Sequence, residues 1–455
     1  MRQRIFVLTL LACAFIPLQA EVPSLVAIQD ARIVTVSGAV IEKGTVVLKD
    51  GIIADVGPNA AVPAGAWVVD GKGLTVYPGL IDAFSTWGIP EAPAAAPAAG
   101  GRGAQAAAAT PGQAAPPRSR GPEDRPGTNS WVMAADLVKN NERRVDLAHS
   151  AGFTTAVTFP RQGLVGGHGA IVNLGGETSG AMVVEPDAGL YMSTTPSGYL
   201  GYPNSLMGVL AYFRQLWIDA NYYKMAKEMY AKSPQTIPRP AYDRALEGVL
   251  SSRRLLVPAA GPVQMERMVK LGKELQTPVV LWGVTEGYRM ADELKKTGTA
   301  VVLNVKWPTR ERDRDPDLID TMKVLEHRDK APTAPVVLAK AGVKFAISSD
   351  GMDSPKDILK ALKKSIDLGL PKEAAIRALT LSAAEIYGVD QRMGSIDKGK
   401  MANLVVVKGD LFDERLTVAM IFVDGVKYLP PPDPPQTPGG NGPGNRPSTT
   451  EQEEN

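Results

Sequence analysis

The stretch Thr75-Val-Tyr-Pro-Gly-Leu-Ile-Asp-Ala-Phe-Ser-Thr-Trp-Gly88 is typical of a buried strand that delivers side chains to a pocket. An apolar run with β-branched residues leads into the turn-forming pair Pro78-Gly79 and resumes at Leu80-Ile81. A carboxylate, Asp82, follows directly. The residues just beyond it, Phe84-Ser-Thr86, would then lie at the mouth of the pocket.

Short apolar runs without strict alternation recur through the middle of the chain, as expected of strands buried on both faces. They alternate with helical patterns over residues 77–393, and no glycine-rich phosphate fingerprint follows an early strand. This alternation favours an α/β fold with a (β/α)8 TIM-like barrel over an open sheet. The runs lie at 154–159, 255–260, 278–282, 300–305 and 343–347, and the helical patterns at 261–271, 288–295, 355–366 and 371–379.

Both ends of the chain have a different pattern, with short strands separated by turn formers. Residues 21–76 and 394–428 are therefore expected to pair into one composite β-sandwich. Two segments, the Ala/Pro/Gly-rich insertion 89–128 and the Pro/Gly-rich tail 429–455, are too poor in apolar residues to order themselves and are expected to be disordered. Because the insertion follows the first barrel strand, it should flank the active face.

Six segments, taken in order along the chain, resemble the imidazolonepropionase-like branch of the amidohydrolase superfamily. They lie at both ends and in the middle, so the resemblance covers nearly all of the ordered chain. The segments are 44–57, 76–82, 151–155, 349–350, 379–384 and 394–402.

The resemblance implies hydrolysis of carbon–nitrogen bonds by a divalent metal, often zinc, held by histidines and by an Asp on the eighth strand. Asp350 is the counterpart of that Asp and the expected catalytic residue. The His-x-His of the first strand is replaced by Phe84 and Thr86, and the sixth-strand histidine falls near Trp282. With only three histidines in the chain, the family's set of metal ligands is incomplete, so no metal site and no cofactor is expected unless the family activity is retained.

Each of the three histidines could in principle replace a missing ligand. His149 ends a helical pattern and is expected to lie at the surface or cap that helix, and His327 lies among charges and should be solvated. His168 sits in a glycine-rich, loop-like setting and is the one expected near the pocket. An all-oxygen site of Asp82, Asp350 and Glu286 could hold magnesium or calcium, although a hydrogen-bonded Asp at a strand end is the commoner outcome.

Metal-free chemistry is a further alternative. Asp350 could act as a general base with Lys306 or Thr86 nearby, although Lys306 is expected to snorkel at a strand end. Three functions follow: an exported amidohydrolase-like protein with doubtful metal-dependent catalysis, a non-catalytic envelope binding or scaffold protein, and an active hydrolase built around Asp82, Asp350 and His168.

Composition and the first residues bear on location and partners. With a net charge of +2, the chain lacks the excess of positive charge that is typical of nucleic-acid-binding proteins. Residues 1–20 have the basic start and short apolar run of a secretory signal, too short for a transmembrane helix. This predicts a periplasmic or secreted protein, and Cys13, the single cysteine, leaves a lipid anchor as the less favoured alternative. A small-molecule ligand of unknown identity is expected, and the family resemblance suggests a homo-oligomer.

Overall fold

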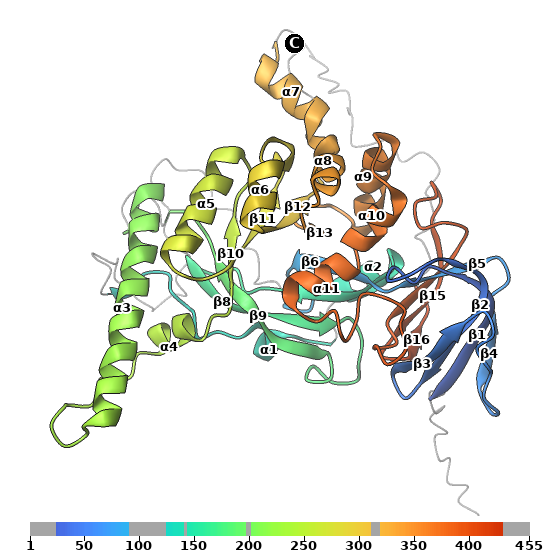
Figure 1. Ribbon diagram of the computed structural model, residues 1–455, viewed down its shortest axis with the longest axis horizontal. Coiled ribbons are helices and arrows are strands. Elements are labelled where there is room, and N and C mark those ends of the chain that lie inside the picture. The colour runs from blue at the N-terminus through green and yellow to red at the C-terminus, as the bar shows by residue number, and fades with distance from the viewer. Residues whose placement is uncertain (1–23, 91–123, 141–142, 197–201, 311–318, 431–455) are drawn as a thin grey trace, which may run out of the picture.

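A computed structural model describes residues 24–90, 124–140, 143–196, 202–310 and 319–430. The predicted signal, most of the predicted insertion and nearly all of the predicted tail lie outside these residues. The described chain forms a central barrel-like sheet surrounded by helices, with a second sheet to one side (Figure 1).

The barrel sheet has eight strands in the spatial order β13-β12-β11-β10-β9-β8-β7-β6. Seven of them run parallel, and β8 is antiparallel to both of its neighbours. The strands are β6 (Leu80–Ser85), β7 (Phe153–Thr158), β8 (Val165–Asn173), β9 (Val183–Met192), β10 (Leu255–Pro258), β11 (Val279–Val284), β12 (Ala300–Asn304) and β13 (Phe345–Ser348).

Five predicted central strands are present as β7, β10, β11, β12 and β13, and the expected TIM-like barrel is confirmed in outline. The antiparallel β8 differs from a regular (β/α)8 barrel, because β7, β8 and β9 are joined without intervening helices. Glycine allows β8 to pack closely: a side chain on Gly169 would meet the Phe159 ring at 2.1 Å. The same glycines gave this segment a loop-like appearance in the sequence.

The described residues form eleven α-helices, most of which surround the barrel. α7 projects away from it, and the long α3 stands at the edge opposite the second sheet (Figure 1). None of the described helices has the length and apolar character needed to cross a membrane. The helices are α1 (Ala134–Leu137), α2 (Arg143–Ser150), α3 (Leu206–Lys232), α4 (Arg244–Leu250), α5 (Pro262–Glu274), α6 (Ala291–Thr297), α7 (Met322–Lys330), α8 (Ala334–Ala341), α9 (Pro355–Asp367), α10 (Lys372–Ala378) and α11 (Leu381–Tyr387).

The second sheet joins the two ends of the chain, since β14 from the C-terminal part pairs with β5 from the N-terminal part. β1 and β2 form an antiparallel pair, whereas β4 and β5 lie parallel to β1, so the first five strands are not a simple meander. The strands are β1 (Leu25–Ile33), β2 (Ile41–Lys49), β3 (Ile52–Gly57), β4 (Trp67–Asp70), β5 (Leu74–Pro78), β14 (Leu404–Lys408), β15 (Thr417–Val423) and β16 (Val426–Tyr428).

Candidate functional site at the barrel mouth

Four aromatic side chains pack together where barrel strands end, and we call them the aromatic cluster: Phe84, Phe159, Tyr191 and Trp282. The Phe84 ring stacks on Trp282 with centroids 4.3 Å apart and on Phe159 at 5.2 Å. Tyr191 closes the group at 6.0 Å from Phe84 and 5.8 Å from Trp282. Such ring pairs stabilise a core by about 1 kcal/mol each beyond the area they bury. The cluster therefore forms a rigid apolar floor at the carboxyl ends of the strands.

A guanidinium group lies on this floor. Arg161 follows β7, and its Cζ lies 4.7 Å from the Phe84 ring centroid and 5.9 Å from that of Trp282. Its Nη1 is 2.6 Å from Oδ1 of Asp350, which follows β13. Both side chains keep part of their surface in solvent, 33% for Arg161 and 21% for Asp350. The mouth thus holds a fixed positive charge paired with the expected catalytic Asp.

The main chain around Asp350 is held by two further bonds. Its backbone N–H donates to Ser348 Oγ at 2.9 Å, and Asn304 Nδ2 donates to its carbonyl oxygen at 3.1 Å. Because these bonds fix the backbone, the carboxylate stays beside Arg161.

Asp82 lies beneath this pair and is fully buried. Its Oδ1 accepts from the backbone N–H of Ser349 at 3.0 Å and of Phe84 at 3.2 Å, and its Oδ2 accepts from the Ser349 hydroxyl. Burial raises the pKa of the Asp82 carboxyl to about 7, although these bonds act in the opposite direction. Asp82 therefore links the end of β6 to the end of β13 across the sheet closure.

Thr86 and Lys306 are held by groups outside the aromatic cluster. Thr86 Oγ1 accepts from Arg144 Nη1 at 2.8 Å, which ties it to α2. The Lys306 side chain is exposed, with its Nζ 3.4 Å from Asp353 Oδ1. The structure therefore places Phe84, Trp282, Asp82 and Asp350 together and leaves Thr86 and Lys306 beside them.

The residues at the mouth do not fit a divalent metal. Aromatic rings stand where the family's ligands would lie, and the positive charge of Arg161 would repel a cation. In the described part of the chain, no three His, Cys, Asp or Glu side chains gather into a group that could hold a metal ion. The all-oxygen alternative is not assembled either, since Glu286 pairs with Arg289 at 3.2 Å.

His168 lies in β8 and not in a loop, which corrects the expectation from its glycines. Its ring is buried, with Nδ1 2.8 Å from Asp187 Oδ1 and Nε2 2.9 Å from the Gly248 carbonyl oxygen. None of these partners belongs to the aromatic cluster. Burial alone would raise the pKa of the Asp187 carboxyl. The hydrogen bond from His168 and the electrostatic interaction with its ring outweigh burial, so the pKa of Asp187 is lowered.

Chain order and contacts also suggest a Ser-His-Asp triad, because Ser251 Oγ lies 3.4 Å from His168 Nε2. The bonding contradicts that role. Nε2 donates to the Gly248 carbonyl and so has no lone pair for the serine proton, and Ser251 itself donates to the same oxygen at 3.0 Å. We therefore interpret His168 as a clamp between β8, Asp187 and α4.

The other two histidines also differ from expectation. His149 is buried, not at the surface, and its Nε2 contacts the Leu174 carbonyl oxygen. Burial lowers its pKa. His327 is half-buried, not fully solvated.

A cavity of about 460 Å³ opens beside the aromatic cluster. Arg161 and Tyr191 form one wall, and Ser193 and Thr195, which follow β9, supply hydroxyl groups. The indole N–H of Trp282 is buried without a hydrogen-bond partner among the described residues. A buried donor of this kind costs about 1–3 kcal/mol unless water or a ligand pairs with it.

Sequence reasoning missed Arg161, Phe159 and Tyr191 as site residues. A signal was present for the first two, because Phe159 ends a predicted barrel strand and Arg161 lies in the loop just beyond it, where loops surround the active face. Tyr191 had no such signal, since β9 was not predicted.

Comparisons with known proteins agree with this architecture. Residues 291–428 match the sequence model of the amidohydrolase family. An amidohydrolase from Thermotoga maritima MSB8 superposes with a TM-score of 0.70 at 22% identity, covering 89% of this chain and 100% of that one. A putative prolidase from Bifidobacterium longum gives 0.52 at 17% identity, covering 91% and 97%.

Curated relatives match over a shorter stretch. Adenine deaminases from two strains of Clostridium botulinum, Loch Maree and 657, are 29% identical over 92 residues, or 19% of this chain. The chain spans 15% of the length of these relatives.

The fold and the position of the site define a TIM-like barrel protein with a second β-sheet and a site at the carboxyl ends of its strands. Residues 291–428 match the amidohydrolase family, and the described chain shares the fold of the Thermotoga maritima amidohydrolase. The chain's resemblance to the imidazolonepropionase-like branch stays a prediction.

Proposed function

We propose that this protein is an exported, small-molecule binding member of the amidohydrolase superfamily, in which a guanidinium has replaced the catalytic metal at the barrel mouth. The observation that carries the proposal is the position of Arg161. It lies on the Phe84–Trp282 stack and pairs with Asp350, the counterpart of the family's catalytic Asp. The metal-dependent hydrolysis that the family resemblance implies would then be lost.

The chemistry of the cavity indicates the class of ligand. Arg161 can bind a carboxylate or phosphate through its planar fork of donors. Tyr191, the member of the aromatic cluster that lines the cavity, favours a flat apolar group beside that anion, and Ser193 and Thr195 can bond to further polar atoms. We therefore propose a small organic anion with a planar apolar part.

Benzoate is a minimal probe of this chemistry. Titration followed by NMR should show saturable binding to the full chain, and Arg161→Gln should weaken that binding at least about tenfold, corresponding to about 1.4 kcal/mol. Lys306→Gln is the matched control, because it removes an exposed cation bonded to Asp353 and not to the aromatic cluster. Equal losses in the two variants, or no loss in Arg161→Gln, would contradict the proposal.

Export is part of the proposal and rests on the signal-like residues 1–20. N-terminal sequencing of the protein from a cell-envelope fraction should find a chain that begins near Glu21. A full-length chain in the cytoplasmic fraction would refute export, and lipid-modified Cys13 would favour the anchored alternative.

A hydrolase with an atypical site is the second candidate. The observation that favours it is Asp82, whose pKa is raised to about 7 by burial beside Asp350, as suits a general acid or base. Its test is hydrolysis of amide and cyclic-amide substrates by the metal-free protein, with Asp350→Ala as the variant. Turnover that Asp350→Ala abolishes would support this candidate over the binding protein.

A further inference from the structure

The long helix α3 is apolar on two opposite faces. Its inner face contributes buried residues to the core, including Phe213, Leu216 and Trp217. Its outer face carries large apolar side chains that remain in solvent, with exposed fractions of 82% for Met207, 61% for Ile218, 68% for Tyr222, 50% for Met225 and 49% for Met229. A helix that is apolar all round is normally covered on both sides.

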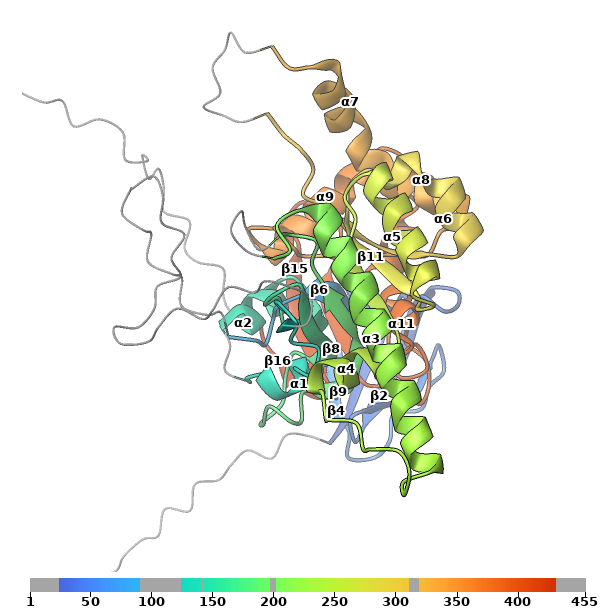
Figure 2. The ribbon, with the colours of Figure 1, turned by 90° about the vertical axis from the view of Figure 1, so that its left-hand side faces the viewer.

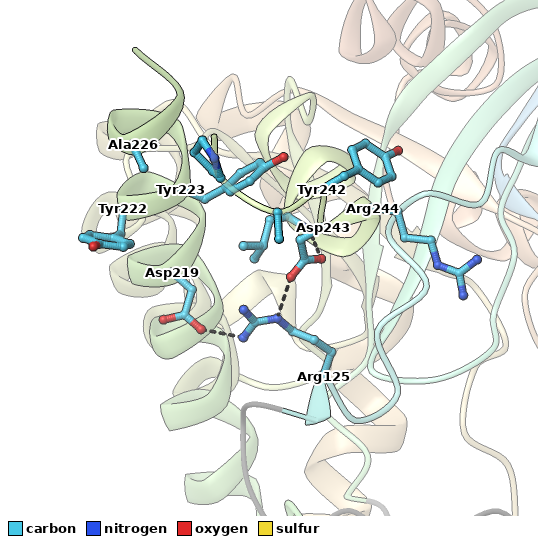
Figure 3. A pocket seen from close by; sticks show the side chains of 11 residues that line it. Arg125, Asp219, Tyr222, Tyr223, Ala226, Tyr242, Asp243 and Arg244 are labelled. Carbon is cyan, nitrogen blue, oxygen red and sulfur yellow. Dashed lines mark hydrogen bonds and ion pairs between the residues drawn. The ribbon is translucent and has the colours of Figure 1, made fainter. Parts of the chain in front are cut away.

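The surroundings leave this outer face open among the described residues. In Figure 2, α3 runs in front of the other elements, and no described element crosses it. Cavities of about 720 and 690 Å³ flank the helix on its two sides, so that it stands as a ridge. Figure 3 shows one of them, where Asp219 and Tyr223 of α3 face Arg125 and Asp243, while the Tyr222 ring points away from that pair.

The spacing along the ridge is symmetric. Residues on the outer face follow one another at intervals of four, three, four, four, three and four positions, and these intervals are the same in both directions from Ile218. They are Met207, Ala211, Arg214, Ile218, Tyr222, Met225 and Met229. Intervals of three and four place these residues in one line along the helix, as in the seam of a coiled coil.

We propose that this ridge pairs with the same ridge of a second copy of the chain, antiparallel, about a two-fold axis at Ile218. Ile218 then meets its own counterpart, Met207 meets Met229, and the small Ala211 leaves room for Met225. Arg214 lies opposite Tyr222, where its guanidinium can pack on the ring. A two-fold interface uses one patch twice, and this patch is complementary to itself in that register.

The area available matches what a stable dimer needs. The exposed fractions of the five large side chains amount to roughly 600 Å² per copy, taking about 200 Å² for each side chain. Two copies would bury about 1,200 Å², at the lower end of specific interfaces. Met, Tyr and Arg are also the residues enriched at such interfaces.

Sedimentation velocity of the full chain tests the proposal. The wild type should be a dimer, and Ile218→Glu should raise the dimer dissociation constant at least about a hundredfold, because two carboxylates would meet at the axis. Val263→Glu is the matched control, since Val263 on α5 is an equally exposed apolar residue, at 66%. A monomeric wild type, or a dimer that Ile218→Glu leaves intact, would overturn the proposal.

Cysteine crosslinking tests the register in a Cys13→Ala background. Ile218→Cys should form an intermolecular disulfide on mild oxidation, because the axis brings the two copies of this position together. Met225→Cys should not, because its two copies would lie about 20 Å apart along the helices. Equal crosslinking at both positions would contradict the register. Protection of Ile218→Cys from a thiol reagent in a monomer would show that another segment covers the ridge, and would also overturn the proposal.

Discussion

Two side-chain pairs at the barrel strands, Arg161–Asp350 and His168–Asp187, have similar geometry and different surroundings. Arg161 and Asp350 meet at 2.6 Å at the mouth, on an aromatic floor and beside a cavity. His168 and Asp187 meet at 2.8 Å inside the fold, and the second nitrogen of the histidine is also occupied. An ion pair at a wet rim can exchange its partner for a ligand, whereas a pair whose histidine is enclosed, with both ring nitrogens bonded, supports the fold. The comparison therefore separates a binding pair from a structural one.

Asp82 is a fully enclosed carboxyl, and its titration should have the largest effect on the free energy of unfolding. Its folded-state pKa of about 7 lies above the ordinary value of 3.8, so the folded protein retains a proton that the unfolded chain releases between these pH values. Stability should therefore fall as pH rises through this window, by up to about 4 kcal/mol. Asp82→Asn should remove this loss, measured by urea unfolding near pH 4 and pH 8.

Comparison with the wild type is essential in that experiment, because His149 acts in the opposite direction. Burial lowers its pKa, so its contribution to stability increases as pH rises toward the ordinary histidine value. The difference between wild type and Asp82→Asn cancels this term. Parallel pH profiles for the two proteins would contradict the assignment for Asp82.

Breaking the His168–Asp187 pair should have the next largest effect on the free energy of unfolding. His168→Leu removes the histidine bonds to the Asp187 carboxylate and the Gly248 carbonyl and should lower the free energy of unfolding by about 3 kcal/mol. His149→Leu is the control, because His149 is also buried and contacts a single carbonyl, and it should cost about 1–2 kcal/mol. Urea unfolding measures both, and equal costs would refute the clamp.

Breaking the Arg161–Asp350 pair at the barrel mouth should have the smallest effect on the free energy of unfolding. Arg161→Met keeps an apolar contact with the aromatic cluster and should change the free energy of unfolding by about 1 kcal/mol or less, since both charges are partly solvated. Thermal unfolding in parallel with His168→Leu checks this. A loss as large as that of His168→Leu would make Arg161 a structural residue and remove the distinction between the two pairs.

Much of the fold could be predicted from the sequence, because patterns within single segments carry it. The β6 segment and five further barrel strands are marked by apolar runs, and their order along the chain indicates the barrel. The contact between Phe84 and Trp282 could also be predicted, since both residues occupy positions where the family resemblance implies metal ligands. The role of Arg161 was not accessible, because it depends on which strand ends adjoin, and the glycines of β8 conceal a strand that only tertiary packing makes visible.

For α3, the sequence predicts the helix but not which of its faces is buried. Its apolar residues point both inward and outward, so its sequence identifies a long helix and not which face the core covers. Only the structure distinguishes Trp217, which is buried, from its neighbour Ile218, which is exposed.

We infer that the Arg161 guanidinium, and not a metal ion, supplies the positive charge at the barrel mouth. The most direct test of this inference is calorimetric titration of zinc into the full chain after metal removal with a chelator. We expect no stoichiometric zinc binding, in the wild type and in Asp350→Ala alike. One equivalent of tightly bound zinc in the wild type, lost in Asp350→Ala, would contradict it.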